Sequence, residues 1–116
     1  MEDRFSQQLK KGVLEMLVLR LICHRPTYGY ELLTSLKEGS GGRFALKEGT
    51  LYPILYRLED EGLIRATWSQ GEGRVAPKKI YEATEAGVLE NIRRMSVWEE
   101  FTKTVNAFLR EEEKND

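Results

Sequence analysis

The sequence predicts a mainly α fold with a small β-hairpin and a long C-terminal helix. Three amphipathic stretches with helical spacing come first, two short alternating stretches then flank a loop with glycine and proline, and one long apolar stripe follows. The chain has 116 residues, of which 41% are hydrophobic and 32% are charged. This length and composition are typical of one globular domain.

The first apolar stretch predicts a helix over residues 8–24. Its apolar side chains recur at steps of three and four, and the stripe is wide enough to require burial on several sides. These residues are Leu9, Val13, Met16, Leu17, Leu21 and Ile22, and Leu14, Val18 and Leu19 widen the stripe. Pro26 ends the helix, because a residue before proline is pushed out of the helical region. Glu15 and Arg20 interrupt the stretch, which falls short of the roughly 20 residues that a membrane-spanning helix needs.

A second helix is predicted over residues 28–38, with Thr27 as its N-cap. Fourfold spacing places three apolar side chains on one face, namely Tyr28, Leu32 and Leu36. The glycine-rich segment 39–42 ends this helix and separates it from the next one.

A third amphipathic helix is predicted over residues 48–61. Its buried face is formed by Leu51, Ile54, Leu55 and Leu58. A proline deep inside a helix costs about 3 kcal/mol. Pro53 therefore requires either that the first turn begins near Gly49 and Thr50 or that the helix bends there.

Two strands are predicted after this helix, over residues 63–68 and 79–84. Gly62 stops the helix, and the residues that follow alternate with the period of a half-buried strand. The connecting residues 69–77 contain two glycines and a proline and form a long hairpin loop.

The last helix is predicted over residues 85–110. Its apolar stripe consists of Val88, Ile92, Met95, Trp98, Phe101, Val105 and Phe108. The steps of three and four resemble a coiled-coil seam, and about 26 helical residues span on the order of 39 Å, further than one small core can cover. We therefore expect the stripe, together with Leu9, to bury against a second copy of the chain. The sequence then divides into a domain of residues 1–84 and a dimerisation helix with a short charged tail, residues 85–116.

Three helices followed by a two-stranded hairpin describe a winged helix-turn-helix, in which the third helix enters the DNA major groove and the hairpin contacts the flanking backbone. The N-terminus of this third helix presents a bare backbone, a hydroxyl and a phenol, at Gly49, Thr50, Tyr52 and Pro53. Helix N-termini favour phosphate, and these side chains can contact base edges. Winged helices also serve as protein-interaction modules without DNA, and a formal net charge of −1 keeps that alternative open.

Four runs in this order resemble the PadR family of bacterial transcription regulators. They are YGYEL at 28–32, GTLYPILYRLE at 49–59, GLI at 62–64 and KKIYEATEAG at 78–87. The resemblance implies a dimeric repressor whose C-terminal helices exchange contacts between subunits, with an effector that weakens operator binding in some members. The chain departs from the family where many members have a serine cap and a proline, since it has Lys47 and Glu48. It departs again at Ile80 and Ala83, which replace the usual aromatic and leucine.

Cations around the hairpin tip are further candidates for DNA contact. Arg74, Lys78 and Lys79 are opposed only by Glu72, and would reach phosphates unless the loop is merely solvated. Residues 37–81 hold eight Lys and Arg against six Asp and Glu, whereas residues 82–116 hold five against nine. This modest asymmetry agrees with a DNA-facing wing and equally with ordinary variation of surface charge.

Four more residues have two interpretations each. Tyr28 and Tyr30 can donate to phosphates through their hydroxyls, although Tyr28 fits equally well in the core. Lys47 and Arg57 are placed to contact DNA, but Arg57 can also pair with Glu61 four residues later.

Trp98 has a structural and a ligand-binding interpretation. The first is an aromatic anchor of the dimer interface. In one multidrug-binding branch that resembles this chain, a tryptophan at the matching position stacks on flat aromatic ligands between subunits. Leu9, Val13 and Met16 would then line the same cleft as Trp98, and the partner would be a small planar aromatic effector.

The sequence offers no parts for an active site or a metal site. Cys23 and His24 have no other cysteine or histidine to join them, and no phosphate-binding glycine loop or nucleophile motif is present. We expect no catalytic residue, no metal and no cofactor. The N-terminus lacks an apolar signal core and the single cysteine cannot form an internal disulfide, so we expect a cytoplasmic protein.

Overall fold

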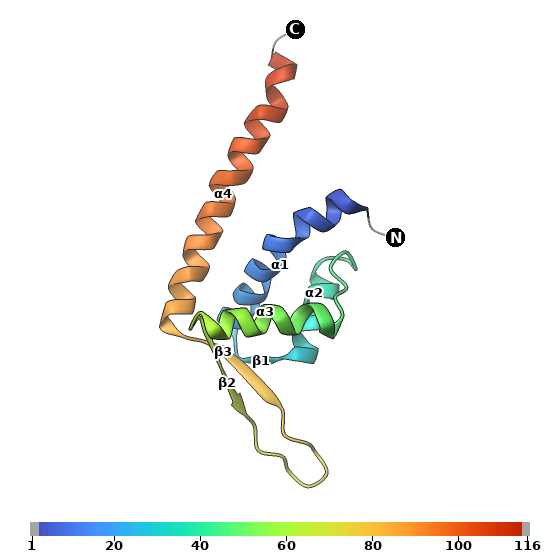
Figure 1. Ribbon diagram of the computed structural model, residues 1–116, viewed down its shortest axis with the longest axis vertical. Coiled ribbons are helices and arrows are strands. Elements are labelled where there is room, and N and C mark those ends of the chain that lie inside the picture. The colour runs from blue at the N-terminus through green and yellow to red at the C-terminus, as the bar shows by residue number, and fades with distance from the viewer. Residues whose placement is uncertain (1–2, 115–116) are drawn as a thin grey trace.

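The fold of the chain is given by a computed structural model that describes residues 3–114, with side chains described as far as residue 110. In chain order the elements are α1 (Arg4–His24), β1 (Thr27–Tyr28), α2 (Gly29–Gly39), α3 (Glu48–Asp60), β2 (Ile64–Trp68), β3 (Lys79–Ala83) and α4 (Glu85–Lys114). Figure 1 shows three helices and the sheet packed together, with the hairpin and α4 projecting at opposite ends. The predicted mainly α winged helix with a long C-terminal helix is confirmed.

The sheet has a third strand that the sequence did not predict. Strands β1, β3 and β2 lie side by side in that order and are antiparallel, with Thr27 opposite Tyr81 and Tyr28 opposite Ile80. The prediction that Thr27 caps α2 is wrong, because the Thr27 hydroxyl instead donates to Glu31 Oε1 at 2.8 Å. A strand of two residues has no periodicity that a sequence pattern can reveal.

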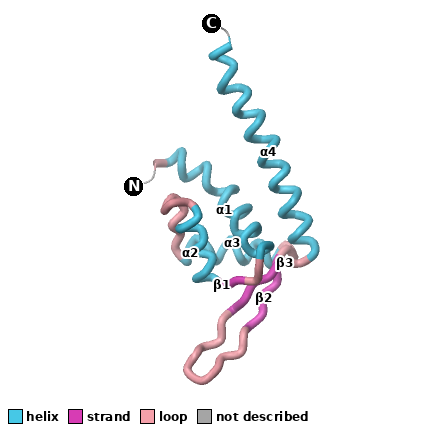
Figure 2. The backbone as a smooth tube through the Cα atoms, turned by 180° about the vertical axis from the view of Figure 1, so that it is seen from behind, coloured by secondary structure: helices cyan, strands magenta, loops and turns pink. Residues whose placement is uncertain are grey.

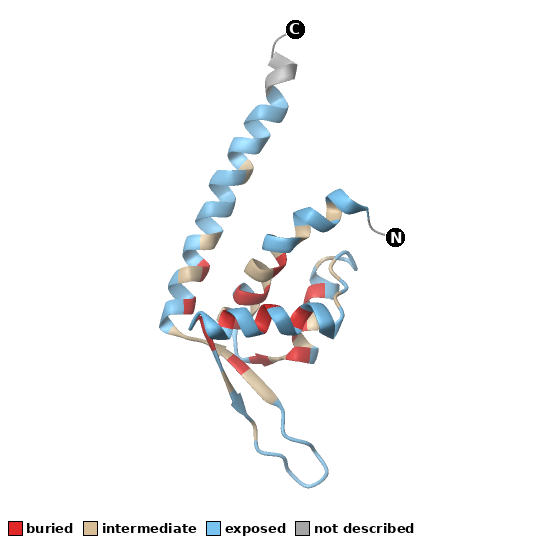
Figure 3. Cartoon of the chain, viewed as in Figure 1, coloured by how far each residue is buried: buried red, intermediate tan, exposed pale blue. Residues whose placement is uncertain are grey.

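The core lies where α1, α2, α3 and the sheet meet (Figure 3). Its fully or nearly fully buried side chains include Val18, Leu19, Ile22, Leu32, Leu51, Leu55, Leu58 and Ile64. On α1 the buried side consists of Ile22 and the residues that widen the predicted stripe, whereas the N-terminal part of the stripe is open. Leu9 is exposed and Val13 and Met16 are only half-buried, whereas Leu14 and Val18 are buried. Part of the apolar surface of α1 is therefore open within one chain.

Helix α3 begins at Glu48, so Pro53 lies in its second turn. Proline has no N–H to donate, and the carbonyl that it would clash with belongs to the residue four positions earlier. That residue is Gly49, which has no side chain and is exposed. The predicted start of the first turn near Gly49 and Thr50 is thus close to what is observed, although the helix starts one residue earlier, at Glu48.

The start of α4 is fixed to the turn after α3 by backbone contacts. The Thr84 N–H donates to the Leu63 carbonyl at 3.0 Å, and the Thr84 hydroxyl donates to the Gly62 carbonyl at 2.7 Å. The Gly87 N–H in turn donates to the Thr84 hydroxyl at 3.0 Å. A Cβ on Gly87 would lie 1.9 Å from the Leu63 oxygen, so the two backbones touch directly.

Beyond this junction α4 projects away from the other helices (Figure 2), and the whole molecule, α4 included, measures 70 × 35 × 20 Å. The helix continues to Lys114, further than the predicted end at residue 110, and residues 115–116 of the predicted tail lie outside the described residues. Across the described part of the chain, no helix combines the length and the apolar character needed to span a membrane.

Candidate nucleic-acid interface

The outward face of α3 is the centre of the candidate interface. At 3.6 residues per turn, the side opposite the buried leucines consists of Gly49, Pro53, Tyr56 and Asp60, and all four are exposed. Tyr56, with 71% of its surface accessible, stands at the middle of this face. The sequence interpretation missed it, although its position outside the stripe of Leu51 to Leu58 was a signal that could have found it.

Thr50 and Tyr52 flank this face at the N-terminal end of α3. Thr50 is exposed, and Tyr52 is 48% exposed. The Tyr52 hydroxyl lies 3.1 Å from where a Cβ on Gly29 would stand, so its ring rests against the start of α2. This contact fixes the ring while leaving one side open to solvent.

The helix has no side-chain cap at its N-terminus. Lys47 occupies the N-cap position, is exposed, and makes no capping hydrogen bond through its side chain. The first turn of a helix leaves amide groups without an intrahelical partner, which attracts anions. The replacement of a serine cap by Lys47 thus places a cation beside a helix end that already favours phosphate.

Arg57 lies at the edge of this surface, with 52% of its side chain exposed, and is held from α1. Its Nε lies 3.2 Å from Glu15 Oε1 on α1, so the predicted pairing of Arg57 with Glu61 is wrong. Glu61 is instead 3.4 Å from Nη2 of Arg94 on α4. The helix-spacing argument for an i,i+4 pair failed because both side chains found partners on other helices.

The wing is the hairpin formed by β2, β3 and the loop between them. At its base the Ser69 N–H donates to the Lys78 carbonyl at 2.8 Å, and the Lys78 N–H donates to Ser69 Oγ at 2.9 Å. Arg74 is exposed at the far end, next to Gly73, whose φ of 57° requires a residue without a side chain. The loop therefore presents the Arg74 side chain at its tip, in a turn whose backbone conformation is set by Gly73.

Pairing of β1 with β3 brings the wing base to the start of α2. Lys78 Nζ lies 4.2 Å from the centre of the Tyr28 ring, and Lys79 Nζ lies 5.5 Å from the Tyr81 ring. Tyr28 is half-buried beneath Lys78, whereas Tyr30 on the first turn of α2 is 73% exposed. Burial raises the pKa of Tyr81. The structure thus places Tyr30 and Lys78 on the open surface and gives Tyr28 a packing role.

Trp68 is a second exposed aromatic that the sequence interpretation did not single out. It ends β2 opposite Lys79 and is 68% accessible. Strand alternation places it on the same face as Ala66 and the buried Ile64, so Trp68 is exposed because it lies beyond the core, which the period-two pattern of residues 63–68 could not have indicated.

Comparison with known proteins identifies the family of the chain. The sequence profile of the Transcriptional regulator PadR-like family matches residues 18–91, which is more than half of the chain. The chain belongs to the PadR-like family. This is a family of transcriptional regulators and not of enzymes, and the match runs from the middle of α1 through the wing to the first turns of α4.

Individual relatives agree with this assignment. A PadR family transcriptional regulator from Eggerthella lenta is 31% identical, with a TM-score of 0.79 over 90% of this chain and 88% of that one. A PadR-like transcriptional regulator from Bacillus cereus is 33% identical, with a TM-score of 0.75 over 89% and 97%. The negative transcriptional regulator PadR of Bacillus subtilis is 32% identical over 67% of this chain, and only 42% of its own length is covered.

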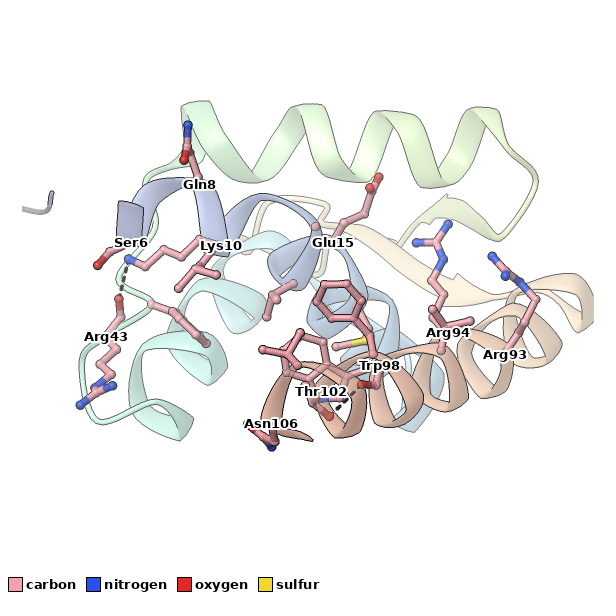
Figure 4. A pocket seen from close by; sticks show the side chains of 18 residues that line it. Ser6, Gln8, Lys10, Glu15, Arg43, Arg93, Arg94, Trp98, Thr102 and Asn106 are labelled. Atoms are coloured by element: carbon pink, nitrogen blue, oxygen red, sulfur yellow. Dashed lines mark hydrogen bonds between the residues drawn. The ribbon is translucent and has the colours of Figure 1, made fainter. Parts of the chain in front are cut away.

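A large cleft lies between α1 and α4, and of the residues that line it only Arg43 and Phe44 fall within the PadR-like match. This cleft has a volume of about 1150 Å³, and Figure 4 shows Trp98 and Glu15 facing it from the two helices. All four residues predicted for an effector line it, namely Leu9, Val13, Met16 and Trp98. The structure therefore brings together residues that are about 80 positions apart in the sequence.

The predicted dimer residues divide between two surfaces of α4. Trp98, Phe101 and Val105 line the cleft, whereas Val88, Ile92, Met95 and Phe108 do not, and every one of these seven side chains is exposed. From Val88 to Phe108 the apolar side chains recur six times over 20 residues. Each step therefore covers fewer than the 3.6 residues of one helical turn. The stripe consequently winds around the helix instead of forming one straight seam.

Ion pairs connect the cleft to α3. Glu90 on α4 accepts hydrogen bonds from Nε of Arg93 and Nε of Arg94, both at 2.7 Å, and these arginines lower the pKa of Glu90 to about 2. Arg94 also reaches Glu61 at the end of α3, and Glu15 reaches Arg57. Glu15, Arg93 and Arg94 all line the cleft, so its two walls are each tied to the same helix.

Among the described residues, no group of three or more His, Cys, Asp and Glu side chains is placed to hold a metal ion. Cys23 donates to the Gly87 carbonyl at 3.7 Å, and burial raises the pKa of its thiol. Cys23 therefore belongs to the packing between α1 and the start of α4.

Proposed function

We propose that the chain is a sequence-specific repressor that binds a palindromic operator as a homodimer, with α3 in the major groove. The observation that carries this proposal is the outward face of α3, which is exposed from Gly49 to Tyr56 and stands beside a cationic wing. A major groove admits one helix, and a wing contacts the backbone next to it. The relative from Bacillus subtilis is a negative regulator, which supports repression over activation.

The exposed apolar residues of α4 support the dimer. A monomer seldom leaves this many large apolar side chains on one helix in contact with water. A second copy of the chain covers them most simply, because a two-fold axis lets one surface serve both partners. The two α3 helices would then face half-sites about one helical turn of DNA apart.

The experiment that tests the proposal starts from fragments of the source genome selected for binding. We expect Thr50→Ala, Tyr52→Ala and Lys79→Ala each to weaken specific binding in gel-shift titrations, while Lys103→Ala on α4 leaves it unchanged. Unchanged affinity in all three interface variants would show that DNA is read elsewhere. Failure to select any fragment would favour the alternative of an interaction module without DNA.

The wing gives a separate prediction about salt. Each lysine or arginine that neutralises a phosphate contributes about 0.9 to the slope of log affinity against log salt. We expect the double variant Arg74→Ala, Lys78→Ala to lower that slope by nearly two and to weaken specific and non-specific binding alike. A slope equal to that of the unmodified protein would mean that the wing does not touch DNA.

A second candidate function is effector sensing in the cleft, favoured by the four predicted side chains that line it. Planar aromatic compounds are expected to quench Trp98 and to release the operator. The Trp68→Phe variant leaves Trp98 as the single tryptophan, so its fluorescence reports the cleft alone. If no compound in a broad panel changes either fluorescence or operator binding, the sensing role loses its support.

A further inference from the structure

The side chains of α3 include few of the groups that read guanine and adenine. In the major groove, Arg and Lys pair with guanine, and Asn and Gln pair with adenine. Residues 48–60 contain no Lys, His, Asn or Gln, and their single Arg57 is paired with Glu15 on α1. The helix therefore carries one residue of the kind that usually discriminates purines, Arg57, and its Nε is held by Glu15 on α1.

Apolar atoms dominate the surface that remains. Pro53 offers ring carbons and Tyr56 a broad aromatic ring, both exposed, while Gly49 allows the backbone to approach closely. The one apolar feature that a base pair presents in the major groove is the C5-methyl group of thymine. The apolar atoms on the outward face of α3 are thus chemically matched to thymine.

Charge limits which part of α3 can approach DNA. Glu59 and Asp60 are exposed in the last turn and would repel phosphates, whereas at the first turn the exposed Glu48 is offset by Lys47. Tyr56 is the last outward residue before this acidic end. The usable surface is therefore the first two to three turns, with Pro53 and Tyr56 near its centre.

We propose that α3 selects thymine through contacts of Pro53 and Tyr56 with its C5-methyl group. The inference rests on the proposed binding of DNA by α3 and adds the chemical basis of its base preference. Tyr56 acts here as a specificity-determining residue through its ring, not through its hydroxyl.

The test replaces each thymine of a selected half-site with deoxyuridine, which keeps the base pair and removes only the methyl group. Loss of one buried methyl is expected to weaken binding about fourfold at the contacted positions. Tyr56→Ala should abolish this sensitivity at one position, and Tyr56→Phe should preserve it. Tyr56 is exposed, so both variants are expected to fold, and thermal unfolding verifies this.

Two results would overturn the inference while leaving DNA binding by α3 intact. One is unchanged affinity when every thymine is replaced, with Thr50→Ala and Tyr52→Ala still weakening binding. The other is a loss of affinity with 7-deazaguanine that disappears in Lys47→Ala, which would assign the base preference to Lys47 and guanine. If none of Thr50→Ala, Tyr52→Ala and Lys79→Ala weakens binding, DNA is read elsewhere, so the proposed binding by α3 fails and the inference falls with it.

Discussion

Replacing Gly87 with alanine is expected to lower the free energy of unfolding by about 3 kcal/mol or more. The added Cβ would lie 1.9 Å from the Leu63 oxygen and 2.9 Å from its carbonyl carbon. These are backbone atoms, and the Leu63 oxygen already accepts from the Thr84 N–H, so they cannot move aside as a flexible side chain would. The start of α4 would have to shift away from the turn after α3.

Urea denaturation followed by circular dichroism measures this effect, with Gly39→Ala as the matched control. Gly39 is the last residue of α2, and an added Cβ there meets nothing within 4 Å. We expect its substitution to change stability by less than about 0.5 kcal/mol. If both variants unfold at the same urea concentration as the unmodified chain, the direct backbone contact at Gly87 does not hold the helix.

The second large effect concerns the proposed dimer. Phe101→Glu places a carboxylate on an apolar wall of the cleft, where the unmodified side chain is 62% exposed in one chain. Burial of an unpaired charge in an interface costs several kcal/mol. We therefore expect a monomer in sedimentation experiments at concentrations where the unmodified protein is a dimer.

Operator binding should weaken together with dimerisation. Linking two half-site contacts raises the overall affinity by 10²- to 10⁴-fold in general, and a monomer loses that gain. The control is Lys103→Glu, which adds the same side chain on α4 outside the cleft. A Phe101→Glu protein that stays dimeric would show that the cleft is not part of the interface.

The predictability of each element followed from the length of its pattern. Helix α3 was correctly predicted because four leucine and isoleucine positions repeat over 13 residues, and β2 and β3 because their alternation is clear. Strand β1 was missed because two residues carry no period, and its pairing partner lies some 50 positions away. Local patterns cannot report a contact of that kind.

The site was less predictable than the fold, for a related reason. Gly49, Thr50 and Tyr52 could be identified since they occupy one helix end, and the cleft residues could be grouped since each lies on an apolar stripe. The partner of Arg57 could not, because it lies on α1. Whether a charged side chain faces solvent or another helix depends on tertiary packing, which no single stretch encodes.

The backbone contact at Gly87 joins α4 to the turn that follows α3, so any rotation of α4 relative to α3 would be centred at this contact. Thirty helical residues extend about 45 Å, so a rotation of about 5° at this contact displaces the far end by about 4 Å. In a dimer held together by α4, the α4 helices would stay fixed. The same rotation would then move each α3 and change the separation of the two α3 helices. If the proposed dimer binds two half-sites, the contact between Gly87 and the Leu63 carbonyl would limit how far their spacing can vary.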